Sequence, residues 1–113
     1  MPRMPHIIQT IIAMQAEILR DDQPEHTGGW REQQVWIGGG YSNSPHTASF
    51  VPPHHERVAA LMDDLVAFAT RSDLPAFAQI AIAHAQFETV HPFPDGNGRT
   101  GRALIQAMLH RLG

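Results

Sequence analysis

HPFPDGNGRTGR, residues 91–102, decides how the rest of this chain is interpreted. The stretch combines a histidine, a carboxylate, a Gly-Asn-Gly turn and two arginines. Gly96 and Gly98 allow the backbone to adopt φ > 0 or to approach a ligand closely. A turn of this kind that leads into a helix presents consecutive N–H groups at the helix N-terminus, where they bind anions. The stretch therefore predicts a phosphate-binding junction between a loop and a helix.

The charged side chains around this turn suit a phosphorylated substrate. Arg99 and Arg102 are three residues apart, so they share a helix face and can bind further phosphate oxygens. Asp95 offers a hard oxygen ligand beside the turn, where a Mg²⁺ ion that bridges phosphates would bind. His91 is of a residue type that accepts protons near neutral pH. Together these residues predict a phosphate-bearing substrate, a metal ion and a general base.

The stretch matches one known signature at eight positions. It resembles the Fic family motif HxFx(D/E)GNGRxxR at every defined position. A Gly- and Pro-rich surface loop is the structural alternative, and so many matches in register argue against it. The resemblance implies a protein adenylyltransferase, which transfers AMP from ATP to a hydroxyl side chain of a target protein and releases pyrophosphate. The matched residues are His91, Phe93, Asp95, Gly96, Asn97, Gly98, Arg99 and Arg102.

Two matched residues have direct roles in this chemistry, and a third supports them. His91 would act as general base and accept the proton of the attacking Ser, Thr or Tyr hydroxyl. Asp95 would hold Mg²⁺ between the α- and β-phosphates of ATP. Phe93 is expected to anchor the loop in the hydrophobic core.

The other matched residues are assigned to the phosphates of ATP. Backbone N–H groups around Gly96 to Gly98, together with the Asn97 side chain, would hold the α-phosphate where charge develops. Arg99 and Arg102 would bind the β- and γ-phosphates and stabilise the leaving pyrophosphate. The assignment of each arginine to one phosphate follows from the resemblance alone.

Three other activities are open at the same site. A Doc-like protein kinase carries a lysine where this chain has Gly98, and the glycine leaves room for the α-phosphate, which favours AMP transfer. Hydrolytic removal of AMP from a protein uses much the same residues. A non-catalytic module that binds a nucleotide or a peptide is the alternative from another class, although the base and both arginines are intact.

Regulation does not follow the pattern of many relatives, which inhibit themselves with a helix of pattern S/TxxxEG/N. No glutamate of this chain has a serine or threonine four residues earlier. An inhibitory partner protein, a further part of a longer gene product, or the lack of any inhibition are the alternatives.

Length and composition bound the class of protein. A chain of 113 residues suffices for one domain, here a Fic domain over residues 1–113. The net charge of −3, with eight arginines and no lysine, provides no basic stripe for nucleic acid. No apolar run of about 18 residues predicts a membrane span, and the start of the chain lacks the pattern of a signal peptide. The lack of cysteine fits a cytoplasmic protein.

Hydrophobic periodicity predicts a mainly α fold. The expected architecture is a Fic-type helical bundle in which one β-hairpin precedes the core helices of residues 54–112. The active loop, residues 91–98, joins the last two helices. The predicted helices cover residues 5–20, 54–70, 75–90 and 98–112.

The hairpin, or flap, is predicted over residues 33–51. Two β-prone pieces flank a Gly- and Ser-rich tip, and Pro52-Pro53 ends the second piece because proline cannot donate a ladder hydrogen bond. The residue order resembles the flap of many Fic proteins, which holds the target segment as an added strand. The resemblance assigns target docking to Val35, Trp36, Ile37, Ala48, Ser49 and Phe50.

Local patterns add expectations around the helix at 75–90. Its inward face is predicted to carry Phe77, Ile80, His84 and Phe87, and Asp73 is a plausible N-cap before Pro75.

The histidines outside the motif invite a metal site. His84, Glu88 and His91 are spaced like ligands on one side of a helix, yet a hydrogen-bonded and mostly buried His84 fits better than a zinc ligand. His54 and His55 are expected to form a surface pair at a helix start.

The last helix carries more apolar surface than one neighbour would cover. Leu104, Ile105, Met108, Leu109 and Leu112 form its stripe, and Ala103 and Ala107 widen it. The N-terminal helix could cover this surface within one chain or across two, and a homodimer is expected.

Overall fold

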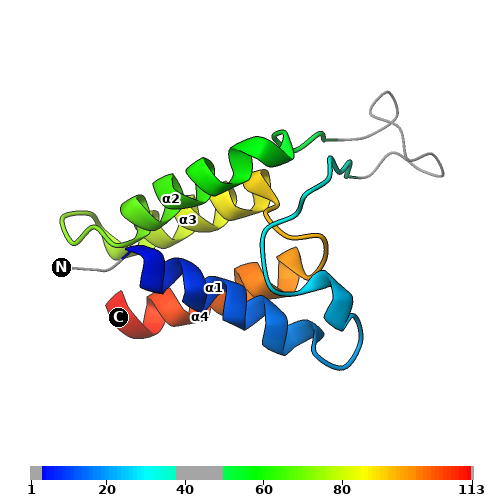
Figure 1. Cartoon of the computed structure of the whole chain (residues 1–113). Helices are drawn as coiled ribbons and strands as arrows, with labels where there is room; N and C mark the ends of the chain where they lie inside the picture. The colour runs from blue at the N-terminus through cyan, green and yellow to red at the C-terminus, as the bar shows by residue number, and fades with distance from the viewer. Residues whose placement is uncertain (1–3, 38–49, 113) are drawn as a thin grey trace.

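The computed structural model describes residues 4–37 and 50–112. Its α-helices form two neighbouring pairs, α1 with α4 and α2 with α3, and two short 3₁₀ turns lie in the connecting segments (Figure 1). The predicted helices are confirmed, with ends shifted by a few residues. The bounds are α1 Met4–Leu19, η1 Pro24–His26, η2 His55–Arg57, α2 Val58–Ala69, α3 Ala76–Val90 and α4 Asn97–Leu112.

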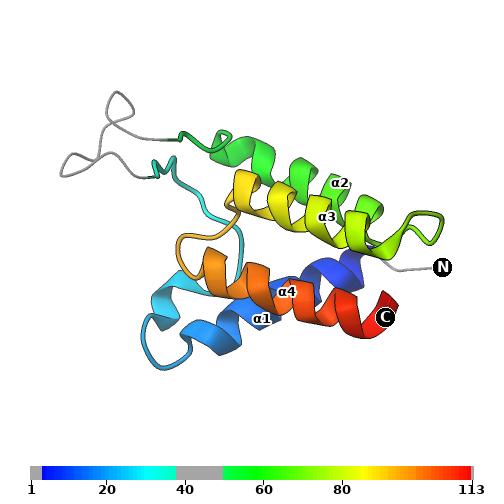
Figure 2. The ribbon, with the colours of Figure 1, turned by 180° about the vertical axis from the view of Figure 1, so that it is seen from behind.

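Apolar side chains from the helices meet between the two pairs to form one core. Each such side chain contributes about 1.5–3 kcal/mol when it is fully buried. The connection from α3 to α4 lies at one end of the bundle, seen from behind in Figure 2, and its Phe93 side chain belongs to the same core. The motif is therefore attached directly to the hydrophobic centre. The fully enclosed apolar residues include Leu19, Val58, Met62, Leu65, Ala83, Phe87 and Phe93.

The predicted β-hairpin is wrong for the residues that the structure describes. Neither residues 33–37 nor residues 50–51 form a strand, and the two pieces meet only in one antiparallel bridge between Ile37 and Phe50. Its two N···O distances are 2.9 and 3.1 Å. The hairpin tip, with the predicted docking residues Ala48 and Ser49, lies outside the described residues.

Side chains occupy the carbonyls that a longer β-ladder would need. Gln34 Nε2 donates to the Pro52 carbonyl at 2.9 Å, and the Arg31 guanidinium donates to the Pro53 and Gln33 carbonyls. The two prolines also lack N–H groups, so they could not donate to a partner strand. These competing hydrogen bonds explain why the β-prone pieces pair at a single position.

A buried glutamine organises the turn between α2 and α3. Gln79 Nε2 donates to the carbonyls of Phe68, Ala69 and Arg71 at 2.8–3.1 Å and so satisfies the C-terminal end of α2. The prediction of Asp73 as an N-cap is wrong, because its carboxylate accepts two hydrogen bonds from Arg71 instead. The residue before α3 is Pro75, and α3 has no side-chain cap there.

The inward face of α3 differs from the prediction. Phe77 is 87% exposed, because the buried stripe runs through Gln79, Ala83, Phe87 and Val90 at spacings of four, four and three. Alanines on several faces of α3 made the direction of its core face ambiguous in the sequence. The inward placement of Ile80 and Phe87 is confirmed.

The apolar stripe of α4 is covered in part within one chain. Leu104 and Met108 are buried, and α1 packs against α4 (Figure 1), whereas Leu109 is exposed. A shallow apolar groove of about 170 Å³ stays open between Ile7 and Ile11 of α1 and Ala107 of α4. The homodimer stays a prediction.

None of the helices within residues 4–37 and 50–112 has the length and apolarity that crossing a membrane requires.

Replacing Gln79 with methionine should lower the free energy of unfolding by about 1–3 kcal/mol, because the carbonyls of Phe68, Ala69 and Arg71 at the end of α2 would each lose a hydrogen bond. Gln86→Met in the same helix is the matched control, since the Gln86 side chain is half-exposed. Its unfolding free energy should change by less than about 0.5 kcal/mol. Urea denaturation followed by circular dichroism measures both, and equal values for the two variants would contradict the role of Gln79.

Candidate active site

His91 ends α3 and turns the chain toward α4. Its backbone lies in the left-handed region at φ 50° and ψ 62°, and its N–H donates to the Phe87 carbonyl at 3.0 Å. A non-glycine residue in this region is uncommon and carries a conformational cost. In the described part of the chain His91 is the sole non-glycine residue with positive φ. Residues 91–96, the motif loop, therefore begin at a strained residue that carries the predicted general base.

Phe93 and Asn97 together close the motif loop. The Asn97 amide accepts from the Phe93 N–H and donates to the Phe93 carbonyl, both at 2.8 Å. The Phe93 ring is fully buried, with its centroid 5.2 Å from Trp30 and 6.4 Å from Phe87. The prediction of Phe93 as an anchor is confirmed. The Asn97 side chain, which was predicted to hold the α-phosphate, is committed to the loop in this structure.

Gly96 is the glycine of the motif that requires a positive φ. It has φ +78°, and a Cβ atom at this position would lie 3.3 Å from the Leu19 side chain. Gly98 lies inside α4 and has no positive φ, so of the two predicted uses of glycine the positive φ is found at Gly96. A Cβ atom added at Gly98 would have Arg102 Nη1 as its nearest neighbour, at 3.5 Å, an ordinary van der Waals contact.

The N-terminus of α4 presents free donors beside a carboxylate. Asp95 Oδ1 accepts from the Gly96 N–H at 2.7 Å, and α4 begins at Asn97. The N–H groups of Asn97, Gly98 and Arg99 have no carbonyl four residues earlier within the helix, so they are available to an anion, whereas the Thr100 N–H donates to the Gly96 carbonyl at 2.9 Å. Arg99 and Arg102 are both exposed on the first turns of α4, and neither has an ion-pair partner among residues 4–37 and 50–112.

Gly101 allows α4 to approach α3 closely. A Cβ atom there would lie 2.7 Å from Glu88 Oε1 and 3.2 Å from Phe87 Cδ1. The helix that carries the arginines is thus packed directly against the helix that ends at the histidine. Gly101 lies inside the motif at a position that the signature leaves undefined, so sequence reasoning had no cause to single it out.

A buried glutamine of α1 holds the motif loop from behind. Gln15 has 0% exposure, and its Nε2 donates to the His26 carbonyl at 2.7 Å and to the Asp95 carbonyl at 3.2 Å. In the sequence, Gln15 stands out only as an interruption of an apolar helical stripe. A polar residue at a core position of that stripe is the signal that could have found it.

Arg31 is a second buried residue that sequence reasoning missed. It is 2% exposed, and its guanidinium donates to backbone carbonyls at the start of the motif loop, including His91 at 2.6 Å. Its own N–H donates to the Pro92 carbonyl at 2.8 Å. No pattern in the sequence separates Arg31 from the other arginines, because its partners are main-chain atoms far along the chain.

The surroundings of His91 favour its neutral form. Burial lowers the pKa of His91 below its ordinary value of 6.5, and the charge of Arg31 lowers it further, whereas Glu88 and Asp95 oppose the shift. Its Nδ1 is buried and has no hydrogen-bond partner within the described part of the chain. A reacting hydroxyl would therefore have to reach Nε2. A neutral imidazole near pH 7 is the state that a general base requires.

The carboxylate of Asp95 has a free oxygen for the predicted Mg²⁺. Asp95 is half-buried and uses Oδ1 for the Gly96 N–H, which leaves Oδ2 without a partner among the described residues. Mg²⁺ commonly binds through one or two carboxylate oxygens while phosphates and water supply the others, so Asp95 fits this ion.

His84 is half-exposed rather than mostly buried, and its Nε2 lies 3.3 Å from Glu88 Oε1.

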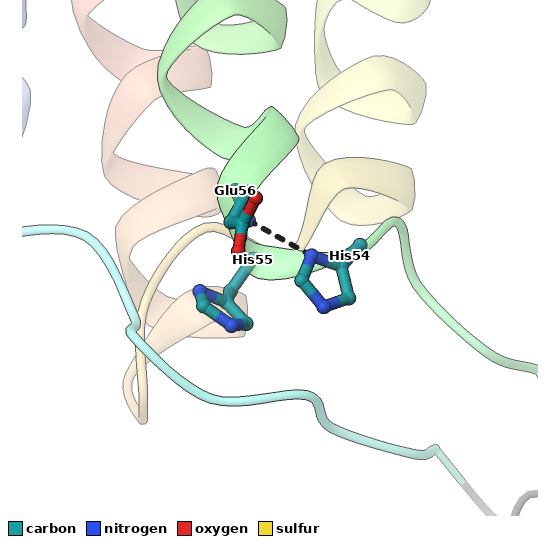
Figure 3. A group of neighbouring side chains, drawn as sticks. All are labelled: His54, His55 and Glu56. Carbon is teal, nitrogen blue, oxygen red and sulfur yellow. Dashed lines mark hydrogen bonds between the residues drawn. The ribbon is translucent and has the colours of Figure 1, made fainter.

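Among the residues that the structure describes, a further cluster of potential metal ligands lies near the start of α2. His54, His55 and Glu56 place a donor atom each within 4.8 Å of one another (Figure 3). The two imidazole rings lie side by side with centroids 4.3 Å apart, and His54 Nδ1 accepts from the Glu56 N–H at 3.3 Å. His54 therefore caps η2, as expected for a histidine at a helix start, and this capping uses one of its ring nitrogens.

An open groove of about 600 Å³ runs beside the motif loop. Its walls come from η1 and the segment that follows it as far as Val35, and it touches the motif at Pro94 alone. Val35, from the predicted docking segment, faces this groove together with Trp30 and Gln33. The groove is lined by residues 25–33, Val35 and Pro94.

Comparisons with known proteins agree on one family. The model of the Fic/DOC family matches residues 6–109. The protein adenylyltransferase Fic of Drosophila willistoni and the protein adenylyltransferase fic-1 of Caenorhabditis briggsae are each 33% identical to this chain over 109 residues. These matches cover 94% of this chain, and the chain spans about a fifth (20%) of the length of either relative.

Solved structures give the same result. The crystal structure of a Fic family protein from Desulfovibrio desulfuricans superposes with a TM-score of 0.75 at 30% identity, covering 89% of this chain and 29% of the other. Fic-1 from Caenorhabditis elegans superposes with a TM-score of 0.67 at 28% identity, covering 92% and 28% of the two chains. The helical architecture described above is therefore shared with these proteins.

The pKa of His91 should lie below 6.5, and Glu88→Gln should lower it further because a carboxylate that favours the imidazolium is lost. Titration of the imidazole signals by NMR measures both values. With a lowered pKa in the folded state, the His91 imidazole binds a proton more tightly in the unfolded chain than in the folded one. The free energy of unfolding should therefore decrease as the pH falls from 6.5 to the pKa of His91 in the folded protein. Glu17→Gln, an exposed change on α1, is the control, and a His91 pKa that rises in Glu88→Gln would contradict the assignment.

Proposed function

Because this chain belongs to the Fic/DOC family, we propose that it transfers AMP from ATP to a hydroxyl side chain of a target protein. The relatives named above are protein adenylyltransferases, and the chain spans about a fifth (20%) of their length. The observation that carries the proposal is the pairing of a half-buried histidine at the end of α3 with the free N-terminus of α4 and its two exposed arginines.

The proposed reaction has one proton transfer and one displacement at phosphorus. The target hydroxyl oxygen attacks the α-phosphorus of ATP, and His91 takes the hydroxyl proton at Nε2. The bond between the α-phosphorus and the oxygen that bridges to the β-phosphate breaks, and pyrophosphate leaves. His91 is suited to this role because burial keeps it neutral, and an unprotonated imidazole accepts the proton.

The chain neutralises the developing charge with donors that already point outward. The first-turn N–H groups of α4 bind the α-phosphate oxygens, and Arg99 and Arg102 bind the β- and γ-phosphates. The exposure of both guanidinium groups and their lack of carboxylate partners in the described chain support this role. Asp95 would hold a Mg²⁺ ion, which would supply charge neutralisation between the phosphates.

The glycine at position 98 favours AMP transfer over phosphate transfer. Gly98 lies in the first turn of α4, beside the N–H groups proposed to bind the α-phosphate, and it adds no side chain there. A Doc-like kinase, which carries a lysine there, is the alternative, as are removal of AMP and nucleotide binding without catalysis.

The target protein is proposed to dock along residues 35–37 and Phe50. Val35 faces the groove that reaches Pro94, so a segment bound in this groove would contact the motif loop. Backbone groups of such a segment could pair with the chain next to the Ile37–Phe50 bridge.

ATP labelled at the α-phosphate should mark a protein in a cell lysate, and ATP labelled at the γ-phosphate should not. His91→Ala should reduce the labelling about 10²–10⁴-fold while ATP affinity stays within about threefold, because the base acts on the hydroxyl and not on the nucleotide. His110→Ala, in the last turn of α4, is the control for loss of a histidine. Labelling from the γ-phosphate alone would establish a kinase, and full labelling by His91→Ala would refute the general base.

Asp95→Asn should raise the Mg²⁺ concentration for half-maximal transfer about tenfold or more, since the amide keeps an acceptor for the Gly96 N–H but loses the charge that binds the ion. Asp22→Asn, an exposed change between α1 and η1, is the matched control and should leave the titration unchanged. A wild-type metal titration in Asp95→Asn would remove Asp95 from the metal site.

A further inference from the structure

Arg31 is a buried cation whose described partners are all main-chain carbonyls. A buried arginine is normally paired with a carboxylate, and none of the ion pairs within residues 4–37 and 50–112 involves Arg31. Instead, its Nε donates to the His91 carbonyl at 2.6 Å, and its Nη2 donates to the Val90 and Pro53 carbonyls at 3.1 and 2.5 Å. Its Nη1 donates to the Gln33 carbonyl at 2.9 Å.

Three of the carbonyls that Arg31 satisfies are consecutive and belong to the end of α3 and the motif loop. The side chain bonds Val90 and His91, and the Arg31 N–H bonds Pro92 at 2.8 Å. Carbonyls at a helix C-terminus have no intrahelical partner and carry a partial negative charge, which a guanidinium satisfies well. The bond to the His91 carbonyl acts at the residue whose backbone is in the left-handed region.

The same guanidinium also bonds residues that flank the segment proposed for target docking. Gln33, bonded by Nη1, lies two residues before Val35, and Pro53, bonded by Nη2, lies three residues after Phe50. One planar group thus connects the residues that flank this segment to the carbonyl of His91. The fork geometry of arginine suits this task, because its donors are rigidly placed, whereas lysine has one flexible nitrogen.

We propose that Arg31 is a positioning residue that holds His91 in its left-handed conformation and sets the direction of its imidazole relative to the docked target hydroxyl. The proposal rests on the proposed AMP transfer. Its geometry is fixed by the bonds from the Arg31 guanidinium to the carbonyls of His91, Val90, Pro53 and Gln33. The positive charge near His91 also opposes protonation of the imidazole, which keeps the base in its reactive form.

The test uses Arg31→Lys, which keeps the charge and loses the fork, in the full chain. We expect kcat for AMP transfer to fall about tenfold or more while KM for ATP changes less than about threefold, because a displaced base slows the chemical step without removing phosphate ligands. Arg57→Lys is the matched control: Arg57 is exposed on η2, and both constants should stay within about twofold.

An NMR readout separates failure of this inference from failure of the proposed function. The imidazole signals of His91 should shift in Arg31→Lys and stay in place in Arg57→Lys, whether or not the protein transfers AMP. A wild-type protein without transfer activity would overturn the proposed function, while the NMR shift would still support the placement of His91 by Arg31. Unchanged His91 signals together with an unchanged kcat would overturn the inference. If Arg31→Lys does not fold by circular dichroism, Arg31→Gln replaces it, and unfolding of both would assign Arg31 to stability alone and overturn the inference.

Discussion

The paired hydrogen bonds between the Asn97 amide and the backbone of Phe93 are the constraint on which the arrangement of the site depends. They join the first residue of α4 to the middle of the motif loop, so the loop can close in one way. The Phe93 ring is then directed into the core between Trp30 and Phe87. Asn97 and Phe93, the two residues that these hydrogen bonds join, are both buried. The direction of the N-terminus of α4 is therefore set by core packing as much as by the loop itself.

Three buried polar side chains outside the motif perform the same kind of task. Gln15, Arg31 and Gln79 each donate to main-chain carbonyls at places where the chain leaves a helix or enters a loop. A small domain cannot bury much apolar area over such segments, and unsatisfied carbonyls inside it would be costly. Polar donors in the core therefore hold the loops of this molecule in place, and two of the three act on the motif loop.

The sequence was sufficient to predict the helices and the identity of the motif residues, because both depend on patterns within short stretches. Hydrophobic periodicity located the helices, and the anchoring role of Phe93 followed from its place between the histidine and the turn. The failures have a common cause. The roles of Asp73 and Phe77 and the hairpin were predicted from local propensity. Arg71 binds the Asp73 carboxylate, and the alanine-rich α3 turns Phe77 to solvent. Side-chain hydrogen bonds to the Pro52 and Pro53 carbonyls compete with the hairpin.

The supporting residues could not be predicted because their partners are distant in the sequence. Arg31 bonds carbonyls about sixty residues away, and Gln15 bonds the carbonyl of Asp95 across a still longer separation.

Gly101 limits the distance between α4 and α3. A side chain at this position would overlap Glu88 Oε1 and crowd the Phe87 ring, both on the facing side of α3. A larger residue at position 101 would therefore push α4 away from α3, and with it Arg99 and Arg102 away from His91.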